Sequence, residues 1–339
     1  MNQEEFIRKM PKVELHVHME GSIRPETLLK LAKRNEVTLP ANNLEKLHDW
    51  YKFVDFPHFI QIYKAIGSCL RSAEDIELIA REFLQGQADQ HILHTEATYT
   101  PYSQYKYSGI SFEDQLAAIN RARKWASETL GVSMTLTLDI SRETSEEEGM
   151  VVADWAISGL GNGVTSLGLG GPEVGNPPEK FTRVFEKARQ AGLHSVPHAG
   201  EVAGPESIWG ALRSLKAERI GHGVRCLEDP GLVEELRKRQ IPLEVSPTSN
   251  VCLKLVDSFE THPLPRLLDE GLYVTLNSDD PPMFNTTLTD EYLKSAKAFG
   301  FSVDQLKSLV MNALEASFLE KDKKETLKSR VGAEFATAL

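Results

Sequence analysis

The chain has 339 residues, and its 38 Lys and Arg against 49 Asp and Glu give a formal net charge of −11. Such an acidic chain would repel a phosphate backbone, so we do not expect DNA or RNA as a partner. The three cysteines are too few and too far apart for a disulfide framework or a cysteine zinc site. The polar N-terminus carries no targeting signal, and no apolar run approaches the roughly 18 residues of a membrane span. We therefore expect a cytoplasmic protein without membrane contact.

The segment from Lys12 to Ser22 predicts the first strand. Side chains alternate across a strand with a period of two, so an apolar and a polar face are expected. The apolar face would carry Val13, Leu15, Val17 and Met19, and the polar face Glu14, His16, His18 and Glu20. Side chains two apart on one face lie roughly 7 Å apart, so both imidazoles could reach one cation. The residues alone leave two interpretations open, half of a metal site or a pair of core histidines.

After this strand, Ser22 followed by Pro25 predicts the start of a helix that continues through Ala32. Residues 38–91 then form a long insertion with helical patterns over 56–68 and 73–85. Its aromatic residues include Trp50, Tyr51, Phe53, Phe56, Phe59 and Tyr63. An insertion of this length is usually functional. The aromatic residues could belong to a lid over a site or to helices packed against the body.

From residue 92 onward, short β-branched runs alternate with helical patterns. The predicted strands are 92–98, 133–140, 164–169, 194–198, 219–222, 242–246 and 272–278. The predicted helices between them are 112–129, 145–158, 178–191, 205–215, 230–239 and 263–270, and three further helices close the chain. With the first strand this makes eight strand–helix units, which predict parallel pairing and a closed (β/α)₈ barrel. We therefore expect one domain over residues 1–339, with 38–91 as a helical insertion.

In such barrels the chemistry lies at the carboxyl ends of the strands. Four predicted strand ends carry candidate groups: His16 and His18 after the first strand, His198 and Glu201 after the fifth, His222 after the sixth, and Asp279 and Asp280 after the eighth. Three imidazoles and a carboxylate suit zinc, and an open position for water is typical of a catalytic site.

Five segments together resemble the adenosine deaminase family of the amidohydrolase superfamily. They are the Lys-Val-Glu-Leu-His-Val-His segment that starts at Lys12, His198-Ala-Gly-Glu201, Arg219-Ile-Gly-His222-Gly, Glu244-Val-Ser-Pro-Thr-Ser-Asn250 and Asn277-Ser-Asp-Asp-Pro281. The resemblance covers nearly the whole chain. It implies a barrel enzyme that binds one Zn²⁺ per chain and displaces ammonia from carbon 6 of an adenine ring by water.

The resemblance also implies a role for each matching residue. The zinc ligands would be His16, His18, His198 and Asp279. The catalytic residues would be Glu201, which protonates ring nitrogen 1 and helps ammonia leave, and His222 and Asp280, which flank the attacking water as an imidazolium and a carboxylate. The substrate contacts would be His18, Glu20 and the backbone N–H of Gly171, which faces purine nitrogen 3. No role is implied for His48, His58, His91, His94, His194 and His262.

Two departures from the family leave the substrate open. Members that act on adenosine usually have aspartate where Glu20 stands, and many members have Glu-x-Arg where this chain has Glu96-Ala97-Thr98. We expect a 6-aminopurine nucleoside, with adenosine converted to inosine as the first choice. Free adenine and 6-aminodeoxyfutalosine are the alternatives.

Other classes of protein fit the sequence less well. Two-metal amidohydrolases need a lysine after the fourth strand, where residues 169–172 read Leu-Gly-Gly-Pro. This favours a single-zinc centre, although another single-zinc amidohydrolase stays a more remote alternative. The cysteine-ligated zinc deaminases need a Cys-x-x-Cys that the chain does not contain. A zinc-stabilised binding protein would not explain Glu201, His222 and Asp280. The oligomeric state stays open.

Overall fold

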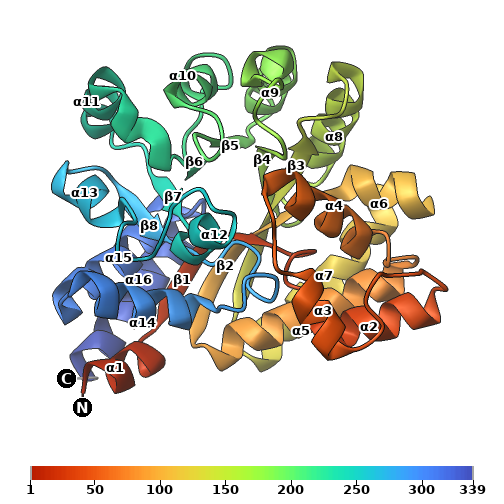
Figure 1. The fold of residues 1–339 in the computed structure, drawn as a ribbon, viewed down its shortest axis with the longest axis horizontal. Coiled ribbons are helices and arrows are strands. Elements are labelled where there is room, and N and C mark those ends of the chain that lie inside the picture. The colour runs from red at the N-terminus through yellow and green to blue at the C-terminus, as the bar shows by residue number, and fades with distance from the viewer. Residues whose placement is uncertain (1, 338–339) are drawn as a thin grey trace.

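The computed structural model describes residues 2–337, which form a ring of eight parallel strands surrounded by helices (Figure 1). The strands are β1 (Lys12–His18), β2 (Ile92–Tyr99), β3 (Ser133–Ser141), β4 (Val164–Gly170), β5 (His194–Ala199), β6 (Ile220–His222), β7 (Leu243–Val245) and β8 (Val274–Leu276). They are hydrogen-bonded in the order β1 to β8. The ring closes just beyond β8, where His18 N donates to Asp279 O at 2.8 Å and Asp279 N donates to His16 O at 3.1 Å. The predicted (β/α)₈ barrel is confirmed.

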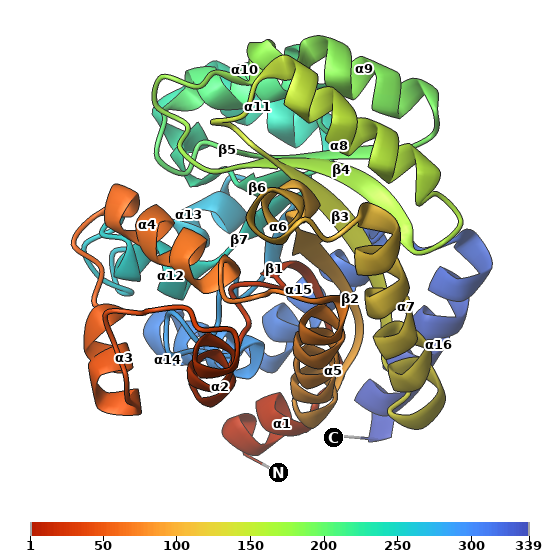
Figure 2. The same ribbon diagram turned by 90° about the vertical axis from the view of Figure 1, so that its right-hand side faces the viewer.

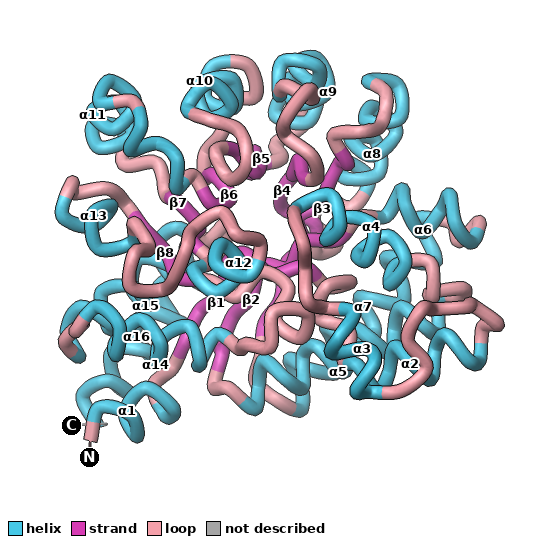
Figure 3. Tube along the Cα trace, viewed as in Figure 1, coloured by secondary structure: helices cyan, strands magenta, loops and turns pink. Residues whose placement is uncertain are grey.

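The outer layer consists of helices that each bury an apolar stripe against the strands (Figure 3). It includes α5 (Ala73–Asp89), α7 (Phe112–Thr129), α8 (Glu146–Ser158), α9 (Thr182–Gln190), α10 (Pro205–Arg213), α11 (Pro230–Arg239), α13 (Leu264–Asp269), α14 (Leu288–Phe299) and α15 (Val303–Ala316). In α9, for example, the buried positions Val184, Phe185 and Ala188 follow the helical period of 3.6. The short turns η1 (Pro178–Phe181) and η2 (Val224–Glu228) precede α9 and α11.

Additional helices lie at the two ends of the barrel. Those near the carboxyl ends of the strands are α2 (Pro25–Arg34), α3 (Leu44–Trp50), α4 (Phe56–Gly67), α6 (Pro101–Ser108) and α12 (Pro247–Cys252), of which α3, α6 and α12 were not predicted. Figure 2 shows α3, α4 and α12 at one end and α16 (Lys321–Thr337) at the other, while α1 (Gln3–Lys9) precedes β1. No described helix is both long and apolar enough to cross a membrane.

The segment between β1 and β2 differs in two details from its prediction. Ser22 is not the N-cap of α2, because its hydroxyl donates to His18 O at 2.6 Å and Arg24 precedes the helix without a side-chain cap. The helix over 73–85 is α5, which packs against α7 and β2 as part of the outer layer. Within the insertion over residues 38–91, α3 and α4 are therefore the helices that stand apart from the barrel layer.

A β-bulge in β1 interrupts the alternation that the sequence predicts. The pairing of β1 with β2 shifts between Glu14 and Val17. Within this shift, Leu15 N and His16 N both donate to Asn277 Oδ1, at 3.0 and 3.1 Å. The predicted polar face is therefore wrong for Glu14, whose carboxylate accepts hydrogen bonds from Gln87 of α5 and from Ser278. His16 lies within the irregularity, and His18 lies beyond it, opposite Thr98 of β2.

Candidate active site

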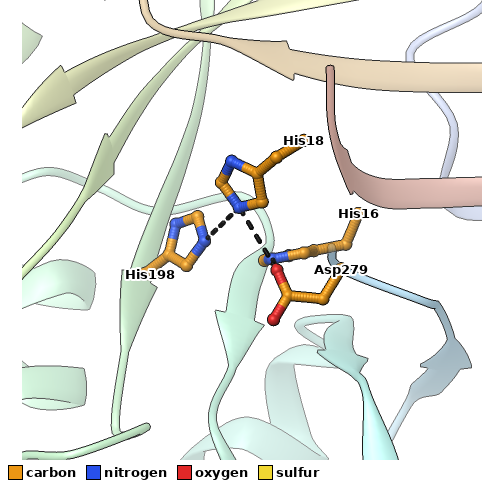
Figure 4. Close-up of side chains that lie close together, drawn as sticks. All are labelled: His16, His18, His198 and Asp279. Carbon is orange, nitrogen blue, oxygen red and sulfur yellow. Dashed lines mark hydrogen bonds and ion pairs between the residues drawn. The ribbon is translucent and has the colours of Figure 1, made fainter. Parts of the chain in front are cut away.

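Three imidazoles and one carboxylate converge at the carboxyl ends of β1, β5 and β8 (Figure 4). His18 Nε2 lies 3.2 Å from His198 Nε2 and 3.3 Å from Asp279 Oδ1. His16 Nε2 lies 3.4 Å from the same carboxylate oxygen and has no hydrogen-bond partner among the described residues. The side chains predicted as metal ligands, His16, His18, His198 and Asp279, thus form one cluster.

The spacing of these atoms fits a tetrahedral metal. Zinc ligands at about 2.0–2.1 Å in tetrahedral geometry are separated from one another by roughly 3.3–3.4 Å. The three separations of 3.2, 3.3 and 3.4 Å match this value. Nitrogen and carboxylate donors are also the ligands that zinc accepts, so the cluster could hold one metal ion.

Buried groups orient His16 toward this cluster. Its Nδ1 lies 2.9 Å from Glu244 Oε2, and the other oxygen of Glu244 accepts from Arg219 Nε at 2.7 Å. Gly221 faces the rings of His16 and His198, where a Cβ atom would lie only 2.8 Å from His16 Cε1. The carboxylate–histidine contact sets the ring orientation, as is usual for metal-binding histidines.

Strained backbone presents two of the site residues. Asp279 and His222 have φ angles of 64° and 62°, in the left-handed region that non-glycine residues seldom adopt. His222 ends the three-residue strand β6, and Asp279 stands three residues after the end of the three-residue strand β8. Strain of this kind clusters at functional sites, where the surrounding fold maintains it.

Glu201 lies on the turn after β5, as predicted, and is 5% exposed. Its Oε1 lies 3.6 Å from His222 Nε2. Burial, with the nearby carboxylates of Asp279 and Glu173, raises the pKa of the Glu201 carboxyl well above its usual value. The environment therefore favours a protonated carboxyl group that could donate to a ligand.

His222 and Asp280 lie beside Glu201 in the same cavity. Burial lowers the pKa of His222 to about 3 and thereby favours the neutral ring, whereas the sequence interpretation used an imidazolium. Burial and the adjacent Asp279 raise the pKa of the Asp280 carboxyl well above its usual value. Asp280 Oδ1 has no hydrogen-bond partner among the described residues.

The cavity in front of this cluster is lined by β-strand ends on one side and by α4 on the other. Phe56, Phe59 and Tyr63 of α4 form its aromatic wall. Gly171 lies on the opposite wall with a φ of 90°, a conformation that glycine adopts readily.

Glu20 is placed differently from its prediction. The strand ends at His18, so Glu20 stands on the following turn and is buried behind the cavity wall. Its Oε1 accepts from Thr100 N at 2.9 Å, and its Oε2 accepts from the Tyr63 hydroxyl at 3.4 Å. Thr100 and Tyr63 both line the cavity, so Glu20 supports the wall through them.

The sequence interpretation missed two acidic residues. Asp139 ends in the cavity from β3, and burial raises the pKa of its carboxyl to about 7. The sequence could have indicated Asp139, because it is the one acidic residue in a predicted strand of apolar and hydroxyl side chains. Glu173 lies under the turn that carries Glu201 and has no comparable sequence signal.

The histidines without a predicted role lie outside the cluster. His262 is buried, and its Nε2 lies 3.1 Å from Asn250 Oδ1. His94 contacts Ser133, and His194 pairs with Glu218.

A parallel barrel with imidazoles and a carboxylate converging at these strand ends is the architecture of metal-dependent amidohydrolases. The family model described as Adenosine deaminase matches residues 11–334. The chain belongs to the adenosine deaminase family.

Individual relatives agree with this assignment. An adenine deaminase of Acinetobacter baylyi is 39% identical over 96% of this chain and 97% of its own length. An aminodeoxyfutalosine deaminase of Streptomyces coelicolor is 40% identical over 96% of this chain and 84% of its own. A crystal structure of an amidohydrolase from Burkholderia ambifaria with bound Zn superposes with a TM-score of 0.92 at 26% identity, covering 100% of this chain and 94% of that one.

Proposed function

We propose that the chain catalyses the hydrolytic deamination of a 6-aminopurine. One water is consumed, the bond from carbon 6 to the amino nitrogen breaks, and ammonia and a 6-oxopurine are released. The observation that carries this proposal is the four-ligand cluster with Glu201, His222 and Asp280 beside it in one cavity. A metal cluster alone would serve a structural role, whereas this set adds groups that can move protons.

In this proposal His16, His18, His198 and Asp279 hold one zinc ion per chain. The separations between their ligand atoms and the zinc in the Burkholderia relative support the choice of metal. When bound, zinc would supply the Lewis acidity that makes water a usable nucleophile at neutral pH.

The protein side chains then share the proton transfers. Protonated Glu201 donates to ring nitrogen 1, and this makes carbon 6 more electrophilic. The raised pKa of the Glu201 carboxyl supports this role, because it favours the protonated form. Neutral His222 orients the attacking water and accepts its proton, while Asp280 orients the same water by a hydrogen bond. The backbone N–H of Gly171 faces nitrogen 3, and its glycine conformation allows the ring to approach closely.

Among the possible substrates, we place free adenine first, ahead of aminodeoxyfutalosine and adenosine. The carboxylate of Glu20 is buried behind the cavity wall, where it is held by Thr100 N and the Tyr63 hydroxyl, so it does not face a ribose hydroxyl in the cavity. The names of the Acinetobacter and Streptomyces relatives also support the first two substrates over adenosine.

We also propose that α4 acts as a lid within the insertion over residues 38–91. Phe56, Phe59 and Tyr63 present aromatic surface to the cavity from a helix outside the barrel layer. Phe59 further stacks on Phe284 from the loop after β8, with ring centroids 5.6 Å apart. Closure of such a wall would exclude water from the reacting ring.

An ultraviolet assay over a panel of 6-aminopurines tests the proposed function, because loss of the amino group changes the absorbance of the ring. The panel contains adenine, adenosine, aminodeoxyfutalosine and AMP, with ammonia release measured in parallel. We expect a clear preference, because a site built around particular polar contacts discriminates by roughly 10⁴-fold or more against a ligand that lacks them. If no member releases ammonia, the proposal is wrong.

A further inference from the structure

The carboxylate of Glu173 is the hydrogen-bonding centre of the turn that carries Glu201. Glu173 Oε1 accepts from the backbone N–H groups of Glu201 and Val202, both at 2.8 Å, and of Ala203 at 3.3 Å. Its Oε2 accepts from Gly200 N at 2.9 Å and from the Ser207 hydroxyl. Four successive backbone donors are thus satisfied by one side chain that is 3% exposed.

The position of Glu173 in the chain gives this contact a second consequence. Glu173 stands two residues after Gly171, on the loop that leaves β4, whereas the turn over 200–203 leaves β5. The same side chain therefore ties the segment of Gly171 to the segment of Glu201 across neighbouring strands. Under the proposed function, these two segments contact nitrogen 3 and nitrogen 1 of one purine ring.

We propose that Glu173 is a positioning residue that sets the distance between the Gly171 N–H and the Glu201 carboxyl group. The inference rests on the proposed function for the identity of the two purine contacts. A bidentate carboxylate suits this task, because an anion accepts several N–H donors and its hydrogen bonds are stronger than those of neutral acceptors. Glutamine at this position would turn one N–H₂ group toward backbone donors and lose the contacts on one side.

The test is a double-variant cycle with Glu173→Gln and Glu201→Gln, measured as kcat and KM on the best substrate of the panel. We expect Glu173→Gln to lower kcat by about 10- to 100-fold with little change in KM or zinc content, since a displacement of about 1 Å can cost 10²-fold. In the Glu201→Gln background the same substitution should have no further effect, because the group it positions is already inactive.

A matched control is Glu206→Gln. Glu206 is an exposed carboxylate in the first turn of α10, directly after the 200–203 turn, and it accepts from a single backbone donor, Gly204 N, at 3.0 Å. We expect wild-type kcat for this variant. If Glu173→Gln does not fold, Ser207→Ala removes only one hydroxyl donor and should give a smaller loss that is again absent in the Glu201→Gln background.

Backbone hydrogen exchange provides a readout that does not depend on activity. The amides of residues 200–203 should be protected in the wild type and exchange faster in Glu173→Gln. Two results would overturn the inference: wild-type kcat for Glu173→Gln, or an equal loss in both backgrounds, which indicates a general structural role. Failure of the proposed function can be distinguished from failure of this inference. In that case the wild-type enzyme deaminates none of the purines, while hydrogen exchange at residues 200–203 still tests whether Glu173 holds the turn.

Discussion

Buried charged and polar groups have different surroundings at the two ends of the barrel. Toward the amino ends of the strands, Arg219 is 1% exposed and lies 2.7 Å from both Glu96 Oε2 and Glu244 Oε1. The Phe318 ring covers its guanidinium carbon at 4.0 Å. Toward the carboxyl ends, buried atoms of His16, His198, Asp139 and Asp280 have no hydrogen-bond partner among the described residues.

This difference indicates what each end does. A buried ion pair with both partners present maintains a shape, and its desolvation cost is offset by short contacts. Buried polar atoms without partners are costly, and a ligand could complete those that face the cavity or the cluster of candidate metal ligands, such as Asp280 Oδ1 and His16 Nε2. Glu244 joins the two ends, since one of its oxygens meets Arg219 and the other meets His16.

The largest effect should come from removing the metal, which would abolish activity at the carboxyl ends of the strands and leave the amino ends unchanged. We expect a strong chelator to abolish activity, and His16→Ala to lose both zinc and activity while the barrel stays folded, because the large core is unchanged. Elemental analysis, circular dichroism and the deamination assay check this. Full activity in a zinc-free sample would contradict the assigned metal site.

Glu201→Gln should come next. The amide keeps the shape of the side chain but cannot exchange a proton at neutral pH, so we expect turnover to fall by about 10²–10⁴-fold with zinc retained. Inhibitor binding should change much less than turnover. Near-native turnover would make Glu201 a structural residue and refute its assigned role.

Arg219→Met should affect the opposite end and act on stability. It leaves the buried carboxylates of Glu96 and Glu244 facing each other without a cation, so we expect the free energy of unfolding to fall by about 3–5 kcal/mol. Arg237→Met, which removes a half-exposed pair with Glu270, is the matched control, with an expected loss of about 0–1 kcal/mol. Denaturant titration measures both, and equal losses would remove the distinction between the ends.

Glu20→Asp should have a smaller, selective effect. The shorter side chain would withdraw from Thr100 N and Tyr63 and free an acceptor toward the cavity, so we expect preference to shift toward adenosine by about 1–3 kcal/mol. The ratio of kcat/KM for adenosine and adenine measures the shift. An unchanged ratio would show that Glu20 only supports the wall.

The smallest effect should be a change in the dynamics of the lid. Binding of a transition-state analogue of deamination should increase hydrogen-exchange protection across residues 50–63, because closure of α4 buries that segment. Helix α9, outside the insertion, serves as the internal control. Equal protection with and without the analogue would make the aromatic wall ordinary packing.

The sequence by itself determined the kind of fold and the positions of the main site residues. Alternating strand and helix patterns imply a parallel barrel, and a parallel barrel brings all carboxyl strand ends to one side. His16, His198, His222 and Asp279 could therefore be grouped from local patterns even though up to 263 positions separate them.

Tertiary structure alone decided how the remaining groups meet. The bulge in β1 arises where Asn277 accepts two adjacent backbone donors, and it moved Glu14 away from the histidines. Glu20 lies beyond the end of β1. Glu173 accepts from backbone N–H groups that are about thirty residues further along the chain. Local periodicity determines the type of an element, whereas turn geometry and ring closure determine which side chains come within hydrogen-bond distance.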